Sequence, residues 1–380
     1  MSDSFAGDFG PFGGRVWLNC AHQGPLPRVA AEAAREAVGW KVAPYRLTSE
    51  RFGGVPRSLR ESLARLVGAA ADDVILANSA SYGLHLMANG LPWKAGDEIL
   101  LMKGDFPSDI LPWLALRDKG VTIRLIEPRR RVVQADELLD HVTGATRLVC
   151  LTWVHSFTGL AIDLKALGGI CRERDIIFFI NASQALGTRP LDVGQVPVDA
   201  VTSVGFKWLC GPYGTGFCWI RPEVRATLRY NQAYWLSMLT ADDLREAVPE
   251  PNPRADLGAR KYVIFGTANF FNFVPWKASV DYILEKGVET IRGHNDRLVS
   301  RFIDGLDRDR YDLLGPEAGP SRSTLIFVSD KKRGHNESLF RRLSENGIDV
   351  ALRAGDLRIS PHLHNTDDCI RRALSVFNRA

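Results

Sequence analysis

Seven short apolar runs alternate with helical patterns between residues 74 and 220, and this alternation constrains the fold more than any other feature. The runs have the length of strands and lie at residues 74–77, 98–102, 121–126, 147–153, 176–180, 198–203 and 217–220. Between two of them, residues 162–174 place Leu164, Leu167 and Cys171 on one helix face, at three- and four-residue spacing. Strands that alternate with such helices predict an α/β fold with a mainly parallel sheet of about seven strands.

The rest of the chain predicts an N-terminal arm and a smaller second domain, since 380 residues suit two domains of roughly 150 residues each. Residues 1–25 are rich in glycine and proline and are interpreted as the arm. We predict a large domain at residues 26–275 and a small α+β domain at residues 276–380. The predicted elements discussed below are helices at residues 58–67, 280–306, 337–346 and 367–378 and a strand at residues 323–328.

The composition is that of an average globular protein, with 45% hydrophobic and 24% charged residues. The net charge of +4 is small and the densest basic run, residues 129–131, contains no aromatic residue, so we expect no nucleic-acid partner. The six cysteines are scattered without a Cys-x-x-Cys pair, which predicts no metal site and favours a reducing compartment. With neither a signal peptide nor an apolar run of ~20 residues, we expect a cytoplasmic protein and no membrane partner.

Lys207 lies in a stretch that favours chemistry, Ser-Val-Gly-Phe-Lys-Trp-Leu-Cys-Gly-Pro-Tyr-Gly-Thr-Gly at residues 203–216. The lysine stands between a short apolar run and a glycine-rich loop. An amine that is partly shielded from water loses its proton more readily and can then condense with an aldehyde. Taken alone, this window is more simply interpreted as a surface lysine beside a turn, so the assignment depends on the rest of the chain.

Polar and aromatic residues follow three other strand ends, where ligands collect in an open α/β sheet. Residues 78–83 open a helical pattern, and Ser79 there either contributes to a phosphate site at the helix N-terminus or simply caps the helix. Phe106 follows the strand at residues 98–102, and Asn-Ala-Ser-Gln at residues 181–184 follows a strongly apolar strand. A lysine, phosphate donors, an aromatic ring and an amide together suit pyridoxal 5'-phosphate.

The chain resembles the class V aminotransferase family of pyridoxal-phosphate enzymes, which have fold type I and include cysteine desulfurases and isopenicillin N epimerase. The resemblance extends from Leu18 to the C-terminal helix. Its most specific motifs are Gly-Phe-Lys-Trp-Leu-Cys-Gly-Pro at residues 205–212, Asn-Ala-Ser-Gln-Ala-Leu-Gly at residues 181–187 and Leu-Arg-Ile-Ser-Pro-His-Leu-His-Asn-Thr at residues 357–366. The resemblance implies a large cofactor-binding domain with a smaller C-terminal domain.

The same resemblance implies roles for individual residues. Lys207 corresponds to the lysine that forms a Schiff base with the cofactor, and Arg358 to the arginine that binds the substrate carboxylate, which suits the fork of a guanidinium. The other implied cofactor-binding residues are Ser79, Ala80 and Ser203 near the phosphate, Phe106 on the ring, Asn181 at the ring nitrogen and Gln184 at the ring hydroxyl. Gly266 and Thr267 resemble the segment that reaches the partner subunit's phosphate, so we expect a homodimer.

Three features depart from the family pattern. Asn181 stands where the family usually has an aspartate that keeps the ring nitrogen protonated, so protonation should be less favoured. Phe206 stands where the family usually has a histidine, and we predict that His22 or His155 is the proton-transfer group instead. We also predict that both histidines and Asn19 are among the substrate-binding residues. Residues 350–358 contain no cysteine and leave little room for a nucleophilic-cysteine loop, so a desulfurase of that type is not expected.

We therefore predict a pyridoxal-phosphate enzyme that acts on an amino acid. The reaction is transamination or, given Asn181 and Phe206, β-elimination or another tailoring reaction on a modified amino acid. The alternative is a binding protein that has lost catalysis and has a regulatory or partner role, although the intact Lys207, Gln184 and Arg358 count against it. A nucleotide site is weaker still, because neither a Gly-x-Gly-x-x-Gly motif after a first strand nor a Walker loop is present.

Overall fold

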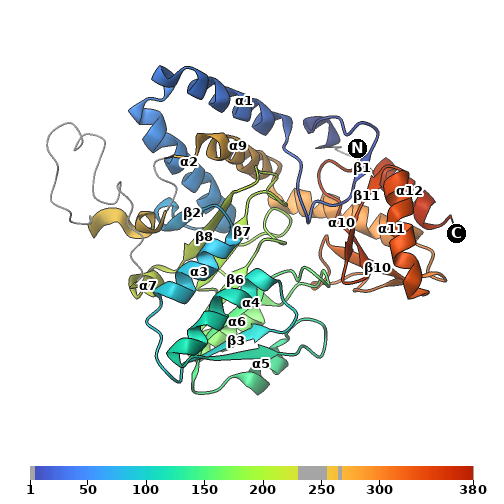
Figure 1. Ribbon diagram of the computed structural model, residues 1–380. Helices are drawn as coiled ribbons and strands as arrows, with labels where there is room; N and C mark the ends of the chain where they lie inside the picture. Colours follow the sequence, from blue (N-terminus) through green and yellow to red (C-terminus); the bar gives the residue numbers. More distant parts are fainter. Residues whose placement is uncertain (1–4, 230–254, 264–267, 380) are drawn as a thin grey trace.

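The computed structural model describes residues 5–229, 255–263 and 268–379, which form a layered α/β structure (Figure 1). Its largest sheet has seven strands in the order β2-β8-β7-β6-β5-β3-β4. The strands are β2 (Val74–Ala77), β3 (Glu98–Met102), β4 (Thr122–Ile126), β5 (Thr146–Thr152), β6 (Ile177–Asn181), β7 (Ala200–Val204) and β8 (Gly216–Ile220). Strand β8 runs antiparallel to both of its neighbours, β2 and β7, and the other four pairings in this sheet are parallel. The predicted α/β fold with a mainly parallel sheet is confirmed.

The central strands form because their residues are apolar on both faces, and every residue of β3, β7 and β8 is buried. Among the helices, α3 (Ala80–Gly90) packs against β7 and β8, and α6 (Leu164–Glu173) packs against β6. Three further helices pack together, α1 (Arg28–Val42), α2 (Ser49–Val67) and α9 (Phe270–Lys286). The shorter helices are α4 (Pro107–Leu114), α5 (Ala135–His141) and α7 (Pro222–Ala226). No helix in the described ranges is both long enough and apolar enough to cross a membrane.

The C-terminal part has its own antiparallel sheet and its own hydrophobic core. The sheet contains β9 (Tyr311–Leu313), β10 (Ile326–Asp330), β12 (Ala351–Arg353) and β13 (Asp356–Ile359), and the helices are α10 (Val288–Gly305), α11 (Asn336–Glu345) and α12 (Asp367–Phe377). The N-terminal arm joins this core, because β1 (Val16–Trp17) pairs with β11 (Ile348–Asp349) and Leu18 is buried in it. The domain boundaries after residues 25 and 275 stay predictions.

The single long helix predicted at residues 280–306 is wrong. The chain forms two helices there, and Gly287 separates α9 from α10 with a φ of 78°. Glycine adopts this left-handed conformation without the steric cost that a Cβ imposes. The N–H of Gly287 donates to the carbonyl oxygen of Ile283 and so ends α9. Apolar residues occur on both sides of the break, which is why the pattern alone did not reveal it.

Two other predicted elements have different bounds. The helix predicted at residues 58–67 begins at Ser49, because the hydroxyl of Thr48 accepts a hydrogen bond from the backbone N–H of Arg51 and caps it. The strand predicted at residues 323–328 is β10, which begins at Ile326. Ser323 bonds locally instead, because its hydroxyl donates to the carbonyl oxygen of Gly159 at 2.6 Å and accepts from the N–H of Leu325 at 3.0 Å.

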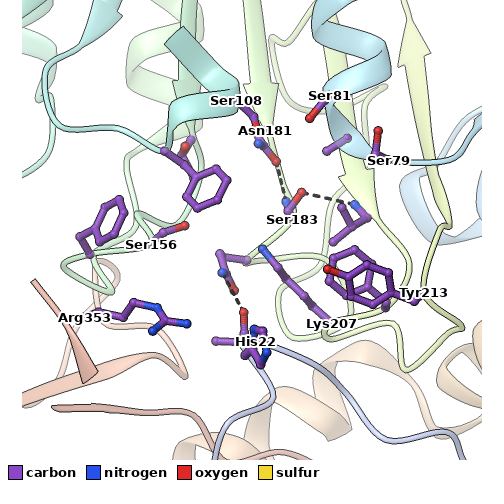
Figure 2. Close-up of a pocket in the computed structure, with 18 of the residues that line it drawn as sticks. His22, Ser79, Ser81, Ser108, Ser156, Asn181, Ser183, Lys207, Tyr213 and Arg353 are labelled. Atoms are coloured by element: carbon purple, nitrogen blue, oxygen red, sulfur yellow. Dashed lines mark hydrogen bonds between the residues drawn. The ribbon is translucent and has the colours of Figure 1, made fainter. Parts of the chain in front are cut away.

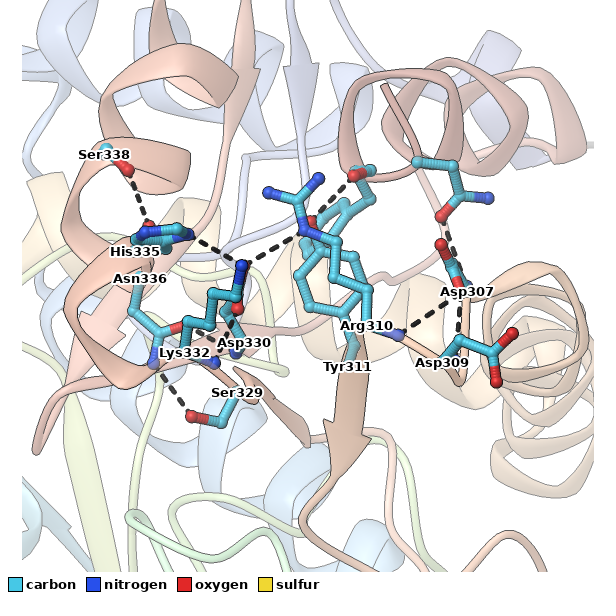
Figure 3. A network of polar contacts seen from close by, with 12 residues as sticks. Asp307, Asp309, Arg310, Tyr311, Ser329, Asp330, Lys332, His335, Asn336 and Ser338 are labelled. Carbon is cyan, nitrogen blue, oxygen red and sulfur yellow. Dashed lines mark hydrogen bonds and ion pairs between the residues drawn. The ribbon is translucent and has the colours of Figure 1, made fainter. Parts of the chain in front are cut away.

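A polar network around Asp330 joins the segment that leads into β9 to the end of β10 and the start of α11 (Figure 3). Asp330 is buried and accepts hydrogen bonds from Nε of Arg310 at 3.1 Å and from the backbone N–H of Lys332 at 2.8 Å. The side chain of Asn336 accepts from the backbone N–H of Asp330 at 2.7 Å and donates to the carbonyl oxygen of Gly355 at 2.8 Å. Since Gly355 lies in the turn between β12 and β13, the network holds the hairpin in place.

Adjacent glycines in α6 provide a test of how this helix packs. A Cβ on Gly168 would lie 2.1 Å from the carbonyl oxygen of Pro197, whereas a Cβ on Gly169 would meet nothing within 4 Å. We expect Gly168→Ala to lower the free energy of unfolding by ~1–3 kcal/mol, because one of the two backbones must move. We expect Gly169→Ala to raise it by about 0.5–1 kcal/mol through helix propensity. Urea unfolding measures both effects, and an equal loss in both variants would contradict this packing.

Candidate active site

A cavity of about 430 Å³ opens at the carboxyl ends of the parallel strands (Figure 2). Residues from the N-terminal arm, from the loop after β7 and from the β12–β13 hairpin also line it. It brings together eight of the residues predicted from the sequence, which are His22, Ser79, Ala80, Phe106, Asn181, Gln184, Lys207 and Arg358. None of the described residues that line it is an aspartate or a glutamate. The cavity is therefore electropositive and suits anionic ligands.

Two predicted residues are buried just outside the lining. Ser203 is in β7, and its hydroxyl donates to the carbonyl oxygen of Val204 at 3.3 Å. Asn19 lies beside Arg358, and its Oδ1 accepts a hydrogen bond from Nη2 of that arginine at 3.4 Å. Asn19 is therefore placed to orient Arg358, and the structure does not bring it to the cavity itself.

One more predicted residue, His155, is not brought to the lining. His155 is buried, and its ring nitrogens bond to the carbonyl oxygen of Gly104 and to the hydroxyl of Thr158, each at 3.0 Å. Both nitrogens are thus used within the chain, which leaves His22 as the histidine that lines the cavity. Gly266 and Thr267 lie outside the described residues.

Lys207 lies on the loop between β7 and β8, and Figure 2 shows its amine inside the cavity. Burial, and then the charge of Arg358, lower the pKa of Lys207 to about 8. An ordinary lysine has a pKa near ~10.4, so a larger share of this amine is unprotonated at neutral pH. The loss of the proton makes the nitrogen a nucleophile and a base.

Helix α3 begins at the cavity with residues that suit an anion. Asn78, Ser79, Ala80 and Ser81 line the cavity there. The hydroxyl of Ser79 bonds to Oδ1 of Asn78 at 3.1 Å and does not cap α3, so the helix-cap alternative is wrong. A Cβ on Gly216 would lie 2.5 Å from the backbone of Ser79, so only glycine allows β8 to lie this close to the turn that precedes α3. The resulting cradle of N–H groups at a helix N-terminus fits a phosphate.

An aromatic ring and an amide border the same space. Phe106 is 41% exposed and stacks on Phe157, with the ring centroids 6.3 Å apart and the planes at 21°. Its own ring centroid lies 5.8 Å from Nζ of Lys207. Gln184 is buried, and its Oε1 accepts from the indole N–H of Trp208 at 2.9 Å. Its Nε2 gives one hydrogen to a backbone oxygen, which leaves the second for a ligand.

Arg358 reaches the cavity from β13 and is only 4% exposed. Burial, and then the charge of Arg353, lower the pKa of Arg358 to about 10. Its Nε finds no hydrogen-bond partner among the residues that the structure describes. A buried guanidinium with unused N–H groups fits a carboxylate, which can accept two of them.

Two residues at the site, Asp109 and Arg353, were not predicted from the sequence. Asp109 is buried in the first turn of α4 and accepts a hydrogen bond from Nδ2 of Asn181 at 2.7 Å. Its signal was its position three residues after Phe106, in the segment that follows a strand end. Arg353 lines the cavity from the end of β12. Its signal was its place five residues before Arg358.

Comparisons with known proteins identify the family. The sequence profile described as Aminotransferase class-V matches residues 46–380. A probable cysteine desulfurase of Methanothermobacter thermautotrophicus is 27% identical over 333 residues, which are 84% of this chain and 78% of the relative. An isopenicillin N epimerase of Streptomyces clavuligerus is 28% identical over 373 residues, 94% of this chain and 92% of the relative.

Solved structures show the same fold. A variant of C-DES with glycine covalently linked to its PLP cofactor has a TM-score of 0.87 at 22% identity and covers 98% of both chains. The complex of the cystine C-S lyase C-DES with cysteine persulfide has a TM-score of 0.85 at 23% identity and covers 97% of this chain and 99% of that one.

The chain therefore belongs to the class V aminotransferase family and has fold type I. Its cofactor is pyridoxal 5'-phosphate, as predicted. The cavity fits this cofactor, because the cradle at α3, the ring of Phe106 and the amine of Lys207 all border it. The roles of the individual residues stay predictions.

The electrostatics of the cavity predict an unusual reactivity for Lys207. In the cofactor-free protein we expect its amine to react with an acylating reagent with a midpoint near pH 8, because only the unprotonated amine reacts. Arg358→Gln should raise that midpoint, because it removes a charge that disfavours the ammonium form. Peptide mass spectrometry against pH measures this. Arg371→Gln, at an exposed pair with Asp368, is the control, and an equal shift in both variants would contradict the prediction.

Proposed function

We propose that this chain is a pyridoxal-phosphate enzyme that acts on an amino acid and holds the cofactor covalently through Lys207. The observation that carries the proposal is the meeting of Lys207, Arg358 and the N-terminus of α3 in one cavity, although these segments are far apart in the sequence. When bound, the cofactor withdraws electrons from the bonds at the α-carbon of the substrate.

For the cofactor we propose Ser79 and Ala80 at the phosphate, Phe106 on the face of the ring, and Asn181 and Gln184 at its polar edge. Their support is that all five line the cavity. Ser203, Gly266 and Thr267 are retained from the family resemblance alone.

For the substrate we propose that Arg358 binds the carboxylate and that Asn19 orients this arginine. Lys207, once released, would move the α-proton, because a pKa of about 8 lets the amine accept a proton and return it near neutral pH. Burial, and then the charge of Arg353, lower the pKa of His22, so His22 is a neutral acceptor at the cavity wall. For His155 we propose an indirect role. Both of its ring nitrogens are bonded within the chain, so it would position Gly104 behind the cavity wall.

Two features favour elimination over transamination. Phe206 is stacked on Tyr213, with the ring centroids 4.2 Å apart, where the family usually has a proton-transfer histidine. One structural neighbour is described as a cystine C-S lyase, which breaks a bond beyond the α-carbon. We therefore propose β-elimination on a modified amino acid, with transamination as the second candidate.

The hairpin before Arg358 counts against a desulfurase that uses a loop cysteine. Strands β12 and β13 are joined by the two-residue turn of Ala354 and Gly355, both at positive φ. Such a turn is the tightest connection between antiparallel strands and leaves no loop. We keep the proposal that the chain is not a desulfurase of this type, although some relatives carry that name.

The alternative of a binding protein without catalysis is less well supported. A site that no longer reacts has no need to bury Lys207 and Arg358 together, since each lowers its own stability by losing hydration. The proposed homodimer rests on the family resemblance. The proposed cytoplasmic location rests on all six cysteines being free thiols, as a reducing compartment requires.

The first test of the function is the variant Lys207→Ala. We expect it to lose turnover and to lose the visible absorbance of the covalently held cofactor, because no other amine among the described lining residues can replace it. The control is Lys103→Ala, an exposed lysine paired with Glu127, which should keep both. Full turnover by Lys207→Ala would contradict the proposed function.

The second test concerns Arg358. Arg358→Lys keeps the charge and loses the fork, so we expect KM for the amino acid to rise about 10- to 100-fold, since a hydrogen bond to a charged group contributes roughly 1.5–3 kcal/mol. The absorbance of the bound cofactor should not change. Product analysis decides the reaction, because elimination releases a keto acid fragment with the aldehyde cofactor retained, and transamination leaves the amine form. An unchanged KM would show that Arg358 does not bind the carboxylate.

A further inference from the structure

Asn181 has a fixed orientation, because its two neighbours demand opposite ends of its amide. The backbone N–H of Ser183 can only donate, and it donates to Oδ1 of Asn181 at 3.0 Å. On the other side, Nδ2 donates to Oδ1 of Asp109 at 2.7 Å. A flipped amide would set the N–H of Ser183 against an NH₂ group and a carboxylate against a carbonyl oxygen.

Asp109 is a carboxyl group without water around it, since it is only 1% exposed. Its other oxygen lies 3.1 Å from the hydroxyl of Thr152, which also bonds to Oδ1 of Asp105. Burial, and then the charge of Asp105, raise the pKa of Asp109 to about 8, while the charge of Lys207 acts against the rise. Two further titratable groups face this pair, since the thiol of Cys150 lies near Asp109 and the ring of His155 near Asp105.

We propose that Asp109 is a positioning residue that supplies, through Asn181, the negative charge that a direct aspartate would otherwise bring to the ring nitrogen of the cofactor. This inference rests on the proposed function. Oδ1 of Asn181 has a second lone pair, and a ring nitrogen that carries a proton can donate to it. The positive charge on the ring then has its counter-charge on Asp109, one amide group further away. The same cation would favour the ionised form of Asp109, which an empty site disfavours.

The second N–H of Asn181 offers the opposite arrangement, because it could donate to a ring nitrogen without a proton. The two arrangements differ in an observable way. A protonated and an unprotonated pyridine nitrogen have well-separated ¹⁵N chemical shifts, so the bound cofactor itself reports which one is present.

The test is ¹⁵N NMR of the full chain reconstituted with ¹⁵N-labelled pyridoxal 5'-phosphate at neutral pH. We expect the protonated shift in the wild type and its loss in Asp109→Asn. The control is Asp105→Asn, which should keep the protonated shift. Asp105 is also buried, but it bonds to Thr152 and to its own segment and not to Asn181, and loss of its charge favours the ionised form of Asp109. An unprotonated wild type, or an unchanged Asp109→Asn, would overturn the inference. Absence of bound cofactor would instead contradict the proposed function.

A swap of the two side chains guards against a folding defect in Asp109→Asn. Asn181→Asp alone sets two carboxyl groups at hydrogen-bond distance, so we expect a lower urea midpoint for the cofactor-free protein. The double variant with Asn181→Asp and Asp109→Asn restores one amide and one carboxylate. It should recover the midpoint and the protonated ¹⁵N shift. If the stability effects of the two substitutions simply add, the two residues are not coupled and the inference is wrong.

The surroundings of Arg353 support a second, independent inference, which concerns the substrate. Figure 2 shows its guanidinium directed toward the middle of the cavity. It makes one hydrogen bond, from Nη1 to the carbonyl oxygen of its neighbour Leu352 at 2.9 Å, and no ion pair within the described part of the chain. Its charge helps to lower the pKa of Lys207 and Arg358. A cation that lies beside other cations is stabilised when an anion binds next to it.

We infer that Arg353 binds a second anionic group in the side chain of the substrate, so that the substrate class is an acidic amino acid. This deepens the proposed function and rests on it. Arg358 is matched by the substrate carboxylate and the α3 cradle by the cofactor phosphate, which leaves Arg353 without a partner. The β12–β13 hairpin is anchored by Asn336, so the guanidinium is presented from a fixed turn.

The test compares acids with their neutral isosteres. Aspartate and glutamate, and separately asparagine and glutamine, are titrated into the holoenzyme while the cofactor absorbance is followed. We expect at least one acid to bind at least tenfold more tightly than its amide. Arg353→Gln should remove that preference without weakening the amide, whereas Arg371→Gln should keep it. Equal binding of acids and amides would overturn this inference, and no spectral response to any amino acid would contradict the proposed function.

Discussion

The structure around the cavity depends on holding three cations close together, of which Arg358 is buried and Lys207 and Arg353 are half-buried. Lys207, Arg353 and Arg358 line one space that contains no aspartate or glutamate among its described residues. Burial, and then the charges of the neighbouring cations, lower the pKa values of Lys207 and Arg358. The cost is offset only when anions enter, and a phosphate and a carboxylate are the anions that the family chemistry brings. One amide away lies the buried carboxyl group of Asp109, whose ionised form a cation in the cavity would favour.

The fold meets this constraint through the direction of its strands. Parallel strands bring the turn after β2, the end of β6 and the loop after β7 to one edge of the sheet. Because β8 is antiparallel, the chain returns at this edge, and the loop that carries Lys207 stays beside the cavity. Arg353 and Arg358 come from another sheet, on a hairpin that Asn336 holds by its turn. The precision of the site therefore depends on rigid elements on both sides.

The sequence predicted the α/β fold, and all seven strands of the large sheet, because continuous apolar runs bounded by turns are a strong signal. It failed at Gly287, where one left-handed residue divides a pattern that looks continuous. It predicted Ser203 near the cofactor and His155 near the substrate, and in the structure both lie behind the lining with their polar atoms bonded to neighbouring groups, so these two roles stay predictions. A spacing of residues indicates which strand end a side chain follows, but not which way the side chain turns.

By itself the sequence determined the class of protein, since the motifs around Asn181, Lys207 and Arg358 are local and can be recognised without knowing how the chain packs. Only the tertiary structure decided the electrostatics of the site. The bond between Asn181 and Asp109 joins residues that are 72 positions apart, and the contact of Arg353 with the cavity depends on how the hairpin docks. The strength of an electrostatic interaction depends on distance and on burial, and the order of the residues in the sequence gives neither.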